Sequence, residues 1–166
     1  MHDLGHRVAV AISRGISVLI AISLSLLACT DGKEGPFLTA QLCVHDENGL
    51  AQLASELKAV AATKGMTFVD SSTDTQRDLE VIGYADRNRA DGSPVFNVAV
   101  KRRDGLGIGA TNLGLPGYQI ALGFTEGASR AETDEFTNEV ISALERSWFV
   151  ERLPAGVGAT PSSACR

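Results

Sequence analysis

Cys43 and His45 carry the side chains that come closest to a catalytic pair in this chain. They are two positions apart, so on a β-strand both side chains point to the same face. An imidazole beside a thiol favours the thiolate, which is the nucleophile of cysteine enzymes. The alternative is a strand end, with Cys43 oxidised and His45 on the surface beside Asp46. We favour this alternative and keep an enzyme that uses Cys43 and His45 as the second hypothesis.

Glycines alternate with other small or apolar residues at positions 105, 107 and 109. A phosphate-binding loop with such glycines is preceded by a strand and followed by a helix. Here the chain continues into Leu113-Gly-Leu-Pro-Gly117, which cannot begin a long helix. We therefore expect a strand with a bare glycine face, open to close approach by a helix, a tail or a partner, and we favour packing within the domain. The opposite face of that strand is formed by Leu106, Ile108 and Ala110.

Aspartates recur at every fourth position of the polar segment 70–78, as Asp70, Asp74 and Asp78. Their carboxylates are of the type that calcium binds, but the set lacks the spacing and the glycine of an EF-hand loop. We expect a solvated loop there, without a metal ion or another cofactor.

Lys101, Arg102 and Arg103 form a run of three basic residues at the end of an expected strand. Such a run is typical of a charged edge that discourages the addition of further strands. It is also a candidate contact for an acidic partner, and Arg87 and Arg89 would extend it if their loop folds nearby.

Residues 16–28 form an apolar run that follows a segment containing Arg7 and Arg14. The run is shorter than the roughly 20 residues that span a bilayer. A basic region, a short apolar core and small residues in this order are typical of a secretory signal. The run ends in Leu26-Leu27-Ala28-Cys29, which resembles the lipobox of bacterial lipoproteins in its residues and its position.

The lipoprotein resemblance covers this segment alone. It implies cleavage before Cys29, a diacylglycerol on the Cys29 thiol and a fatty acyl chain such as palmitate on the new amino terminus, a combination that anchors stably in a membrane. Thr30 rather than an aspartate follows the cysteine. In bacteria with two membranes this implies the outer membrane, facing the periplasm, and in bacteria with one membrane its outer surface.

Cys43 and Cys165 remain after Cys29 is lipidated, as an even pair in an oxidising compartment. We predict that they form a disulfide, which would tie the loop-like stretch 154–163 back onto the first strand. The alternative is a buried thiol at Cys43 and a frayed end at Cys165. Once residues 1–28 are removed, His45 is the single histidine, which excludes a zinc site built on two histidines of this chain.

The pattern of apolar residues predicts helices at 50–62 and 129–148, where buried positions recur at helical spacing. Ser129 and Glu132 fit a capping box at the start of the second helix. Residues 30–36 are expected to be a tether and residues 70–78 a loop. Strands are expected at 37–44, 66–69, 79–85, 95–101, 106–113, 118–124 and 149–153.

These elements predict an α+β two-layer sandwich, with a mostly antiparallel sheet and two helices packed on one face. The strands around Asp104-Gly105, at 95–101, 106–113 and 118–124, should form an antiparallel meander. The order is similar to a ferredoxin-like plait with extra strands. We expect residues 1–28 to be the signal, 29–36 the lipidated tether and 37–166 a single domain.

The chain has 166 residues and a formal net charge of −5. A negative balance argues against nucleic acid or an anionic membrane surface as the main partner. The leading hypothesis is a non-catalytic binding or accessory module, anchored in the envelope by lipid, with a protein or envelope component as its partner. Inhibition of a toxin or hydrolase, as in an immunity factor, is one candidate duty. The alternatives are a periplasmic enzyme using Cys43 and His45, and a purely structural envelope lipoprotein.

Overall fold

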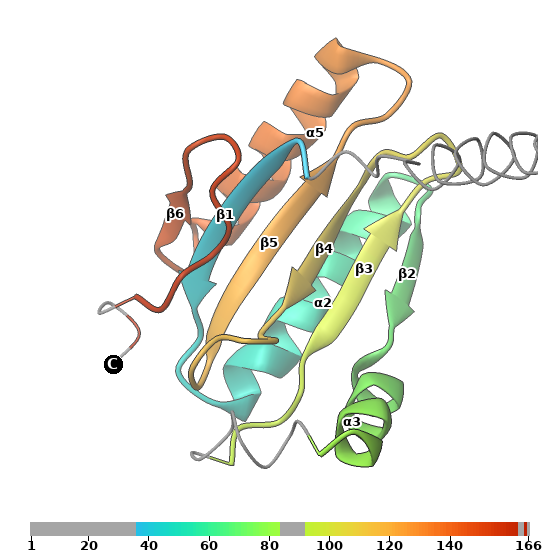
Figure 1. Ribbon diagram of the computed structural model, residues 1–166. Helices are drawn as coiled ribbons and strands as arrows, with labels where there is room; N and C mark the ends of the chain where they lie inside the picture. Colours follow the sequence, from blue (N-terminus) through green and yellow to red (C-terminus); the bar gives the residue numbers. More distant parts are fainter. Residues whose placement is uncertain (1–35, 84–91, 163–164, 166) are drawn as a thin grey trace, which may run out of the picture. The chain divides into compact units, whose positions relative to one another are not determined.

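The computed structural model describes residues 36–83, 92–162 and 165, which contain an antiparallel sheet of six strands (Figure 1). The strand order is β2-β3-β4-β5-β1-β6. The strands are β1 (Leu38–Cys43), β2 (Thr67–Asp70), β3 (Asn97–Lys101), β4 (Gly107–Thr111), β5 (Gln119–Thr125) and β6 (Val150–Arg152). Six of the seven expected strands are therefore confirmed, with ends that differ by at most two residues from the predicted ones.

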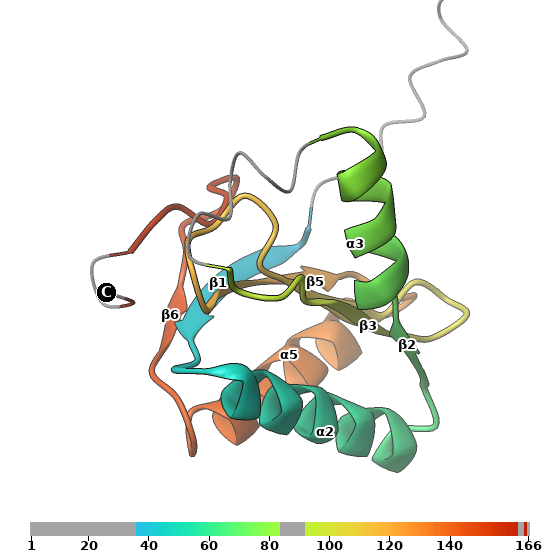
Figure 2. The same ribbon diagram turned by 90° about the horizontal axis from the view of Figure 1, so that it is seen from below.

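Two long helices lie against the same face of the sheet (Figure 2). The first, α2 (Glu47–Thr63), connects β1 to β2, and the second, α5 (Arg130–Leu144), connects β5 to β6. The pairings between neighbouring strands are all antiparallel, so each long helix joins two strands that run in the same direction. The predicted α+β sandwich and the β3-β4-β5 meander are confirmed.

The long helices begin at residues that cap them and bury one apolar side. The carboxylate of Asp46 accepts a hydrogen bond from Gly49 N (2.9 Å) at the start of α2. Ser129 Oγ accepts one from Glu132 N at the start of α5, as the sequence predicts. The buried apolar side chains of the two helices are Leu50, Leu53, Leu57, Ala61, Phe136, Val140, Ile141 and Leu144.

The core lies between these helices and one face of the sheet, which we call the covered face. Most strand residues that point to this face are buried and apolar, because side chains alternate along a strand. Phe124 of β5 meets Phe136 of α5 edge to face, with ring centres 6.5 Å apart. The other main strand contributors are Leu42, Val98, Val100, Ile108, Ile120 and Leu122.

A third helix, α3 (Ser72–Val81), overturns two predictions. Most of the segment 70–78 is helical and not a loop, and residues 79–81 belong to the same helix and not to a strand. Residues 84 and 85, at the end of the predicted strand 79–85, lie outside the described residues. The helix buries none of its residues, so its sequence lacks the apolar stripe from which a helix is predicted. It lies on the opposite side of the sheet from α2 and α5 (Figure 2).

Candidate binding surface

The face of the sheet turned away from α2 and α5, the open face, is lined by small side chains at its centre. One row across β3, β4, β5 and β1 consists of Ala99, Gly109, Gly123 and Thr39. The next row along the strands consists of Asn97, Thr111, Ala121 and Gln41. The helix α3 stands on this side near β2 and β3, and the chain after β6 passes near β1 (Figure 2).

The glycine-rich stretch belongs to β4, so the predicted strand with one bare face is confirmed. Leu106, Ile108 and Ala110 are buried on the covered side, as expected. A Cβ on Gly107 would lie 2.5 Å from the carbonyl oxygen of Val100, so close packing within the sheet requires this glycine. A Cβ on Gly109 would meet no atom within 4 Å. Internal packing therefore explains Gly107 but leaves Gly109 facing open space.

A groove of about 280 Å³ lies over this part of the open face. Its floor is formed by residues of β1, β3, β4 and β5, and its lining is mainly apolar. Pro36 lies on one side of the groove, where a Cβ on Gly123 would come within 3.4 Å of the proline ring. Gly158 lies in the lining as well, so the groove ends against the chain that follows β6.

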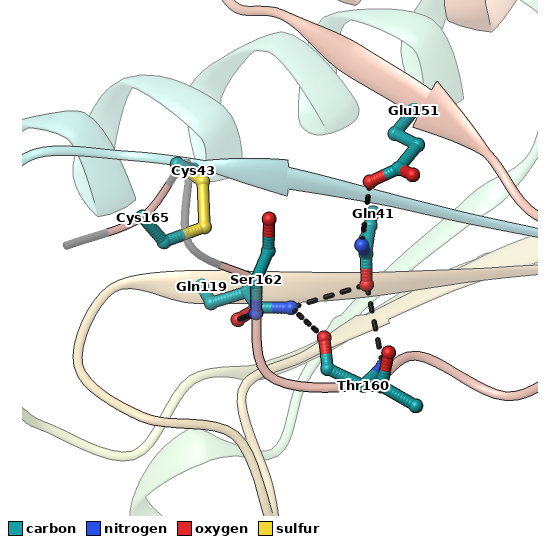
Figure 3. Close-up of a disulfide and its surroundings, with 7 residues drawn as sticks. All are labelled: Gln41, Cys43, Gln119, Glu151, Thr160, Ser162 and Cys165. Atoms are coloured by element: carbon teal, nitrogen blue, oxygen red, sulfur yellow. Dashed lines mark hydrogen bonds between the residues drawn. A yellow bond between two sulfur atoms is a disulfide. The ribbon is translucent and has the colours of Figure 1, made fainter.

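Two glutamines on the open face hold that following chain by its main chain (Figure 3). Gln119 Nε2 donates to the carbonyl oxygen of Thr160 (2.7 Å), and Gln119 Oε1 accepts from Ser162 N (2.8 Å). Gln41 Oε1 accepts from Thr160 N (3.3 Å) and from Gln119 Nε2 (3.1 Å). Gln41 Nε2 donates to Glu151 Oε2 (2.7 Å). We call Gln41 and Gln119 the amide pair, and residues 154–162 with Cys165 the tail.

The amide pair is buried although it lies on the open face. Gln119 is fully buried and Gln41 is 5% exposed. Buried amides cost free energy unless their hydrogen-bonding groups are satisfied. These two glutamines were not among the residues that the sequence singled out, because their main partners lie 41 to 119 positions away along the chain.

A disulfide joins Cys43 at the end of β1 to Cys165 in the tail (Figure 3). Their Cα atoms are 5.3 Å apart, which is within the usual range for a disulfide. The predicted pairing of these cysteines is therefore confirmed. It ties the tail to the open face next to the amide pair.

The disulfide and the end of β1 separate the two members of the suggested nucleophilic pair. The sulfur of Cys43 is bonded to Cys165 and carries no thiol. Since β1 ends at Cys43, His45 does not share its strand face and instead lies exposed just before Asp46. The favoured interpretation of the sequence, a strand end with an oxidised cysteine and a surface histidine, matches this geometry.

The basic run divides into one residue with partners and two exposed residues. Arg102 binds both carboxylate oxygens of Asp104 (2.8 and 2.6 Å) and both of Glu132 (2.5 and 2.8 Å). It thereby connects the β3–β4 turn to the first turn of α5. Lys101 and Arg103 are exposed, and no carboxylate within the described ranges lies at ion-pair distance from them. Arg87 and Arg89, which were expected to extend the cluster, lie outside the described residues.

The ion pairs of Arg102 shift the titration of its partners. Hydrogen bonds from the guanidinium hold the pKa of the Asp104 carboxyl far below its ordinary value and lower that of Glu132 as well. The pKa of Arg102 is raised by the same hydrogen bonds, those to Glu132 first and those to Asp104 next. Because the charge of Arg102 is already paired with Asp104 and Glu132, Arg102 is less available to an acidic partner than the sequence predicts.

The three aspartates of segment 70–78 lie along α3 and just before it, and two of them have separate side-chain contacts. Asp70 Oδ1 accepts a hydrogen bond from Ser72 N (2.9 Å), and Asp74 pairs with Arg77 on the helix surface. Across the part of the chain that the structure describes, no group of three or more histidine, cysteine, aspartate or glutamate side chains could hold a metal ion.

Comparison with known proteins adds no family to this geometry. Neither a protein-family model nor a curated protein sequence matches the chain. Among the helices within residues 36–83, 92–162 and 165, none is long and apolar enough to cross a bilayer. The expected signal at 1–28, the lipidation site Cys29 and the start of the tether lie outside the described residues.

Proposed function

We propose that this protein is a non-catalytic binding module of the cell envelope, anchored by lipid on Cys29, whose open face holds an extended segment of a protein partner. The observation that carries the proposal is the amide pair. Two buried glutamines on the open face already bind a stretch of chain outside the helices and strands through its main-chain atoms.

The chemistry of the amide pair suits this task. A glutamine amide offers N–H donors and a carbonyl acceptor, which are the same functions that a neighbouring strand would offer. A segment bound in this way is recognised chiefly by its main chain, and pockets beside it supply the preference for side chains. Thr160 and Ser162 of the tail illustrate such binding within the molecule.

The adjoining groove favours a peptide segment over a cofactor as its occupant. Its lining is mainly apolar, so it offers few polar groups that could orient a cofactor. The glycine and alanine positions on its floor let a main chain approach the strands closely. Ala121 of that floor is paired directly with Gln41, so the groove and the amide pair form one continuous surface.

The proposed anchor would keep this surface close to the membrane. Pro36 lies at the groove, and a fully extended chain from Cys29 to Pro36 reaches at most about 25 Å. A partner that is itself part of the envelope would therefore meet the groove within a short distance of the bilayer. The tie of Cys43 to Cys165 and the exposed position of His45 support binding rather than nucleophilic catalysis.

The proposal is tested by cross-linking the full-length lipidated protein in membranes of its own host and identifying recovered partners by mass spectrometry. Gly109→Arg is the decisive variant, because a side chain there fills the groove without meeting another atom at its Cβ. Ala51→Arg, on the exposed side of α2, is the matched control. We expect one partner in near-stoichiometric amount from the wild type and the control, and about a tenfold loss from Gly109→Arg.

Equal recovery from Gly109→Arg and Ala51→Arg would place the partner elsewhere and contradict the proposal. An empty result from correctly lipidated protein would contradict it as well and favour a purely structural role. The charge reversal Lys101→Glu with Arg103→Glu then examines the candidate basic contact. If these residues touch the partner, recovery falls while the melting temperature stays the same, because both side chains are exposed.

A further inference from the structure

We propose that the tail is a built-in occupant of the partner site, and that opening the Cys43–Cys165 disulfide frees the amide pair for an extended, uncharged segment of similar sequence. This inference rests on the proposed function and adds two things to it: the chemical class of the partner segment, and a redox control over how much of the site is available.

The tail is lightly packed on the sheet. Residues 154–158, 160 and 161 are exposed, and Val157, an apolar residue in this stretch, is 43% exposed. Burial of apolar surface therefore contributes little to holding the tail on the sheet. The ties of the tail include the hydrogen bonds to the amide pair and the disulfide, and the disulfide is the covalent one, so its loss should change the position of the tail most.

The disulfide affects how well an incoming peptide can compete with the tail for the amide pair. With the bond closed, the segment is fixed at one end by β6 and at the other by Cys43. A segment held at both ends has a high effective concentration at its site, and an incoming peptide competes poorly with it. With the bond open, the segment is tethered only through β6, so its effective concentration falls and a partner segment can replace it.

The covalent step is a thiol–disulfide exchange with a dithiol reductant, the co-reactant that the proposal requires. One thiolate of the reductant attacks a sulfur of the Cys43–Cys165 bond and forms a mixed disulfide. Its second thiol displaces the remaining cysteine, so the reductant leaves as a disulfide. Cys43 and Cys165 together take up two electrons and two protons and become thiols. Both cysteines are partly exposed, which gives the reductant access.

The sequence of the tail indicates the class of segment that fits. Residues 158–162 are Gly-Ala-Thr-Pro-Ser, which are small, uncharged and include a proline. The main-chain N–H groups of Thr160 and Ser162 are bonded to the amide pair, and Pro161 stands between them. Alternate residues of an extended chain face the same side, so a proline at the middle position loses no hydrogen bond. A partner segment should share this pattern of small residues around a proline.

The test uses the full-length protein in detergent micelles and a fluorescein-labelled, end-capped peptide with the sequence of residues 154–162. Fluorescence anisotropy gives its dissociation constant for the oxidised protein, the dithiothreitol-reduced protein and the Cys43→Ser/Cys165→Ser variant. We expect the two opened forms to bind at least about tenfold more tightly than the oxidised form. Far-UV circular dichroism confirms that all three forms remain folded.

A second probe needs no change in the protein. The same peptide with an N-methyl group at the threonine equivalent to Thr160 lacks the N–H that Gln41 accepts. It should bind the opened protein up to about tenfold more weakly, as expected for one lost hydrogen bond. Equal binding of the two peptides, or equal binding to the oxidised and opened proteins, would overturn the inference.

The failure of this inference can be told apart from the failure of the proposed function. If opening the disulfide leaves peptide binding unchanged while Gly109→Arg still lowers partner recovery, the tail is not an occupant and the proposed function stands. If the peptide binds only the opened protein while Gly109→Arg recovers the partner normally, the tail blocks the amide pair but the partner binds elsewhere, so the proposed function is wrong and the inference that rests on it is wrong as well.

Discussion

Gly123 and Phe124 are neighbours on β5, yet they belong to surfaces with opposite properties. Phe124 is fully buried on the covered face and meets Phe136 of α5, whereas Gly123 lies on the open face beneath Pro36. Because successive side chains of a strand point to opposite faces, these two neighbours lie on different surfaces. The covered face is filled by large apolar side chains, whereas small side chains line the centre of the open face.

Buried polar side chains lie on both sides of the sheet, and one of them lacks a hydrogen-bond partner among the described residues. On the open face, the amide pair is buried and satisfied by the tail and Glu151. On the covered side, the hydroxyl of Thr137 in α5 is buried without a hydrogen-bond partner among the described residues. On the same helix, Thr133 is fully buried as well, and its hydroxyl accepts from Gly127 N (3.1 Å) and donates to the carbonyl oxygen of Ser129 (2.9 Å). Thr137 is therefore an exception among the buried hydroxyls of α5, and its lack of a partner costs free energy.

The largest expected effect on stability comes from the covered face. Phe124→Ala should lower the free energy of unfolding by about 3–5 kcal/mol, because it leaves a cavity between β5 and α5. Urea denaturation measures the loss. The open-face control on the same strand is Ala121→Ser, which should change stability by no more than about 0.5 kcal/mol. Similar losses for the two variants would mean that the open face is packed as the covered face is.

The next largest effect separates the tail from the core. Replacing both cysteines by Cys43→Ser/Cys165→Ser should cost about 2–4 kcal/mol, because the cross-link restricts the unfolded chain. The far-UV circular dichroism spectrum of the folded state should not change, since the tail contributes no strand or long helix. A variant whose spectrum lost helix or strand signal would show that the tail supports the core and would weaken the contrast between the faces.

A smaller effect of the opposite sign is expected at the unsatisfied hydroxyl. Thr137→Val keeps the side-chain shape and removes a buried polar group that has no partner, so it should stabilise the protein by about 1 kcal/mol. The melting temperature reports this gain. The matched comparison is Gln119→Leu on the open face, which removes a satisfied polar group and should be destabilising. Loss of stability in Thr137→Val would show that its hydroxyl has a partner in solution.

The elements of the covered face could be predicted from the sequence because burial gives a periodic signal. The apolar residues of α2, α5 and the alternating strands all point to the same core. The disulfide could also be predicted, since two cysteines remain once Cys29 is assigned to lipid. The polar helix α3 gave no such signal, because its contacts with β3 are hydrogen bonds from Asn97 to Ser72 and Thr75 rather than buried apolar contacts.

The open face could be predicted only in part. Alternation around Gly107 and Gly109 indicates a bare face, but nothing in the sequence says that the tail crosses it. The roles of Gln41 and Gln119 depend on main-chain atoms of Thr160 and Ser162. Every residue except proline has the same main-chain groups, so such a contact cannot be recognised from the types of residue in the sequence. In the same way, Arg102 was grouped with its neighbours because Glu132, which binds it, lies 30 positions further along the chain.

The smallest expected effect concerns the ion pairs that connect the β3–β4 turn to α5. In the folded protein, hydrogen bonds from Arg102 hold the pKa values of Asp104 and Glu132 below their ordinary values. Carboxylates with lowered pKa values stabilise the folded state above the pKa values of the unfolded chain, near 4, and lose this contribution as the pH falls. The difference in melting temperature between the wild type and Arg102→Met should therefore be greatest above pH 5 and shrink below pH 4.

Arg103→Met is the control, because no carboxylate among the described residues lies at ion-pair distance from Arg103, and its melting temperature should follow that of the wild type at every pH. If the difference in melting temperature for Arg102→Met instead stayed constant down to pH 2, Arg102 would act through the packing of its aliphatic side-chain carbons and not through its ion pairs. The β3–β4 turn would then belong to the apolar packing of the covered face.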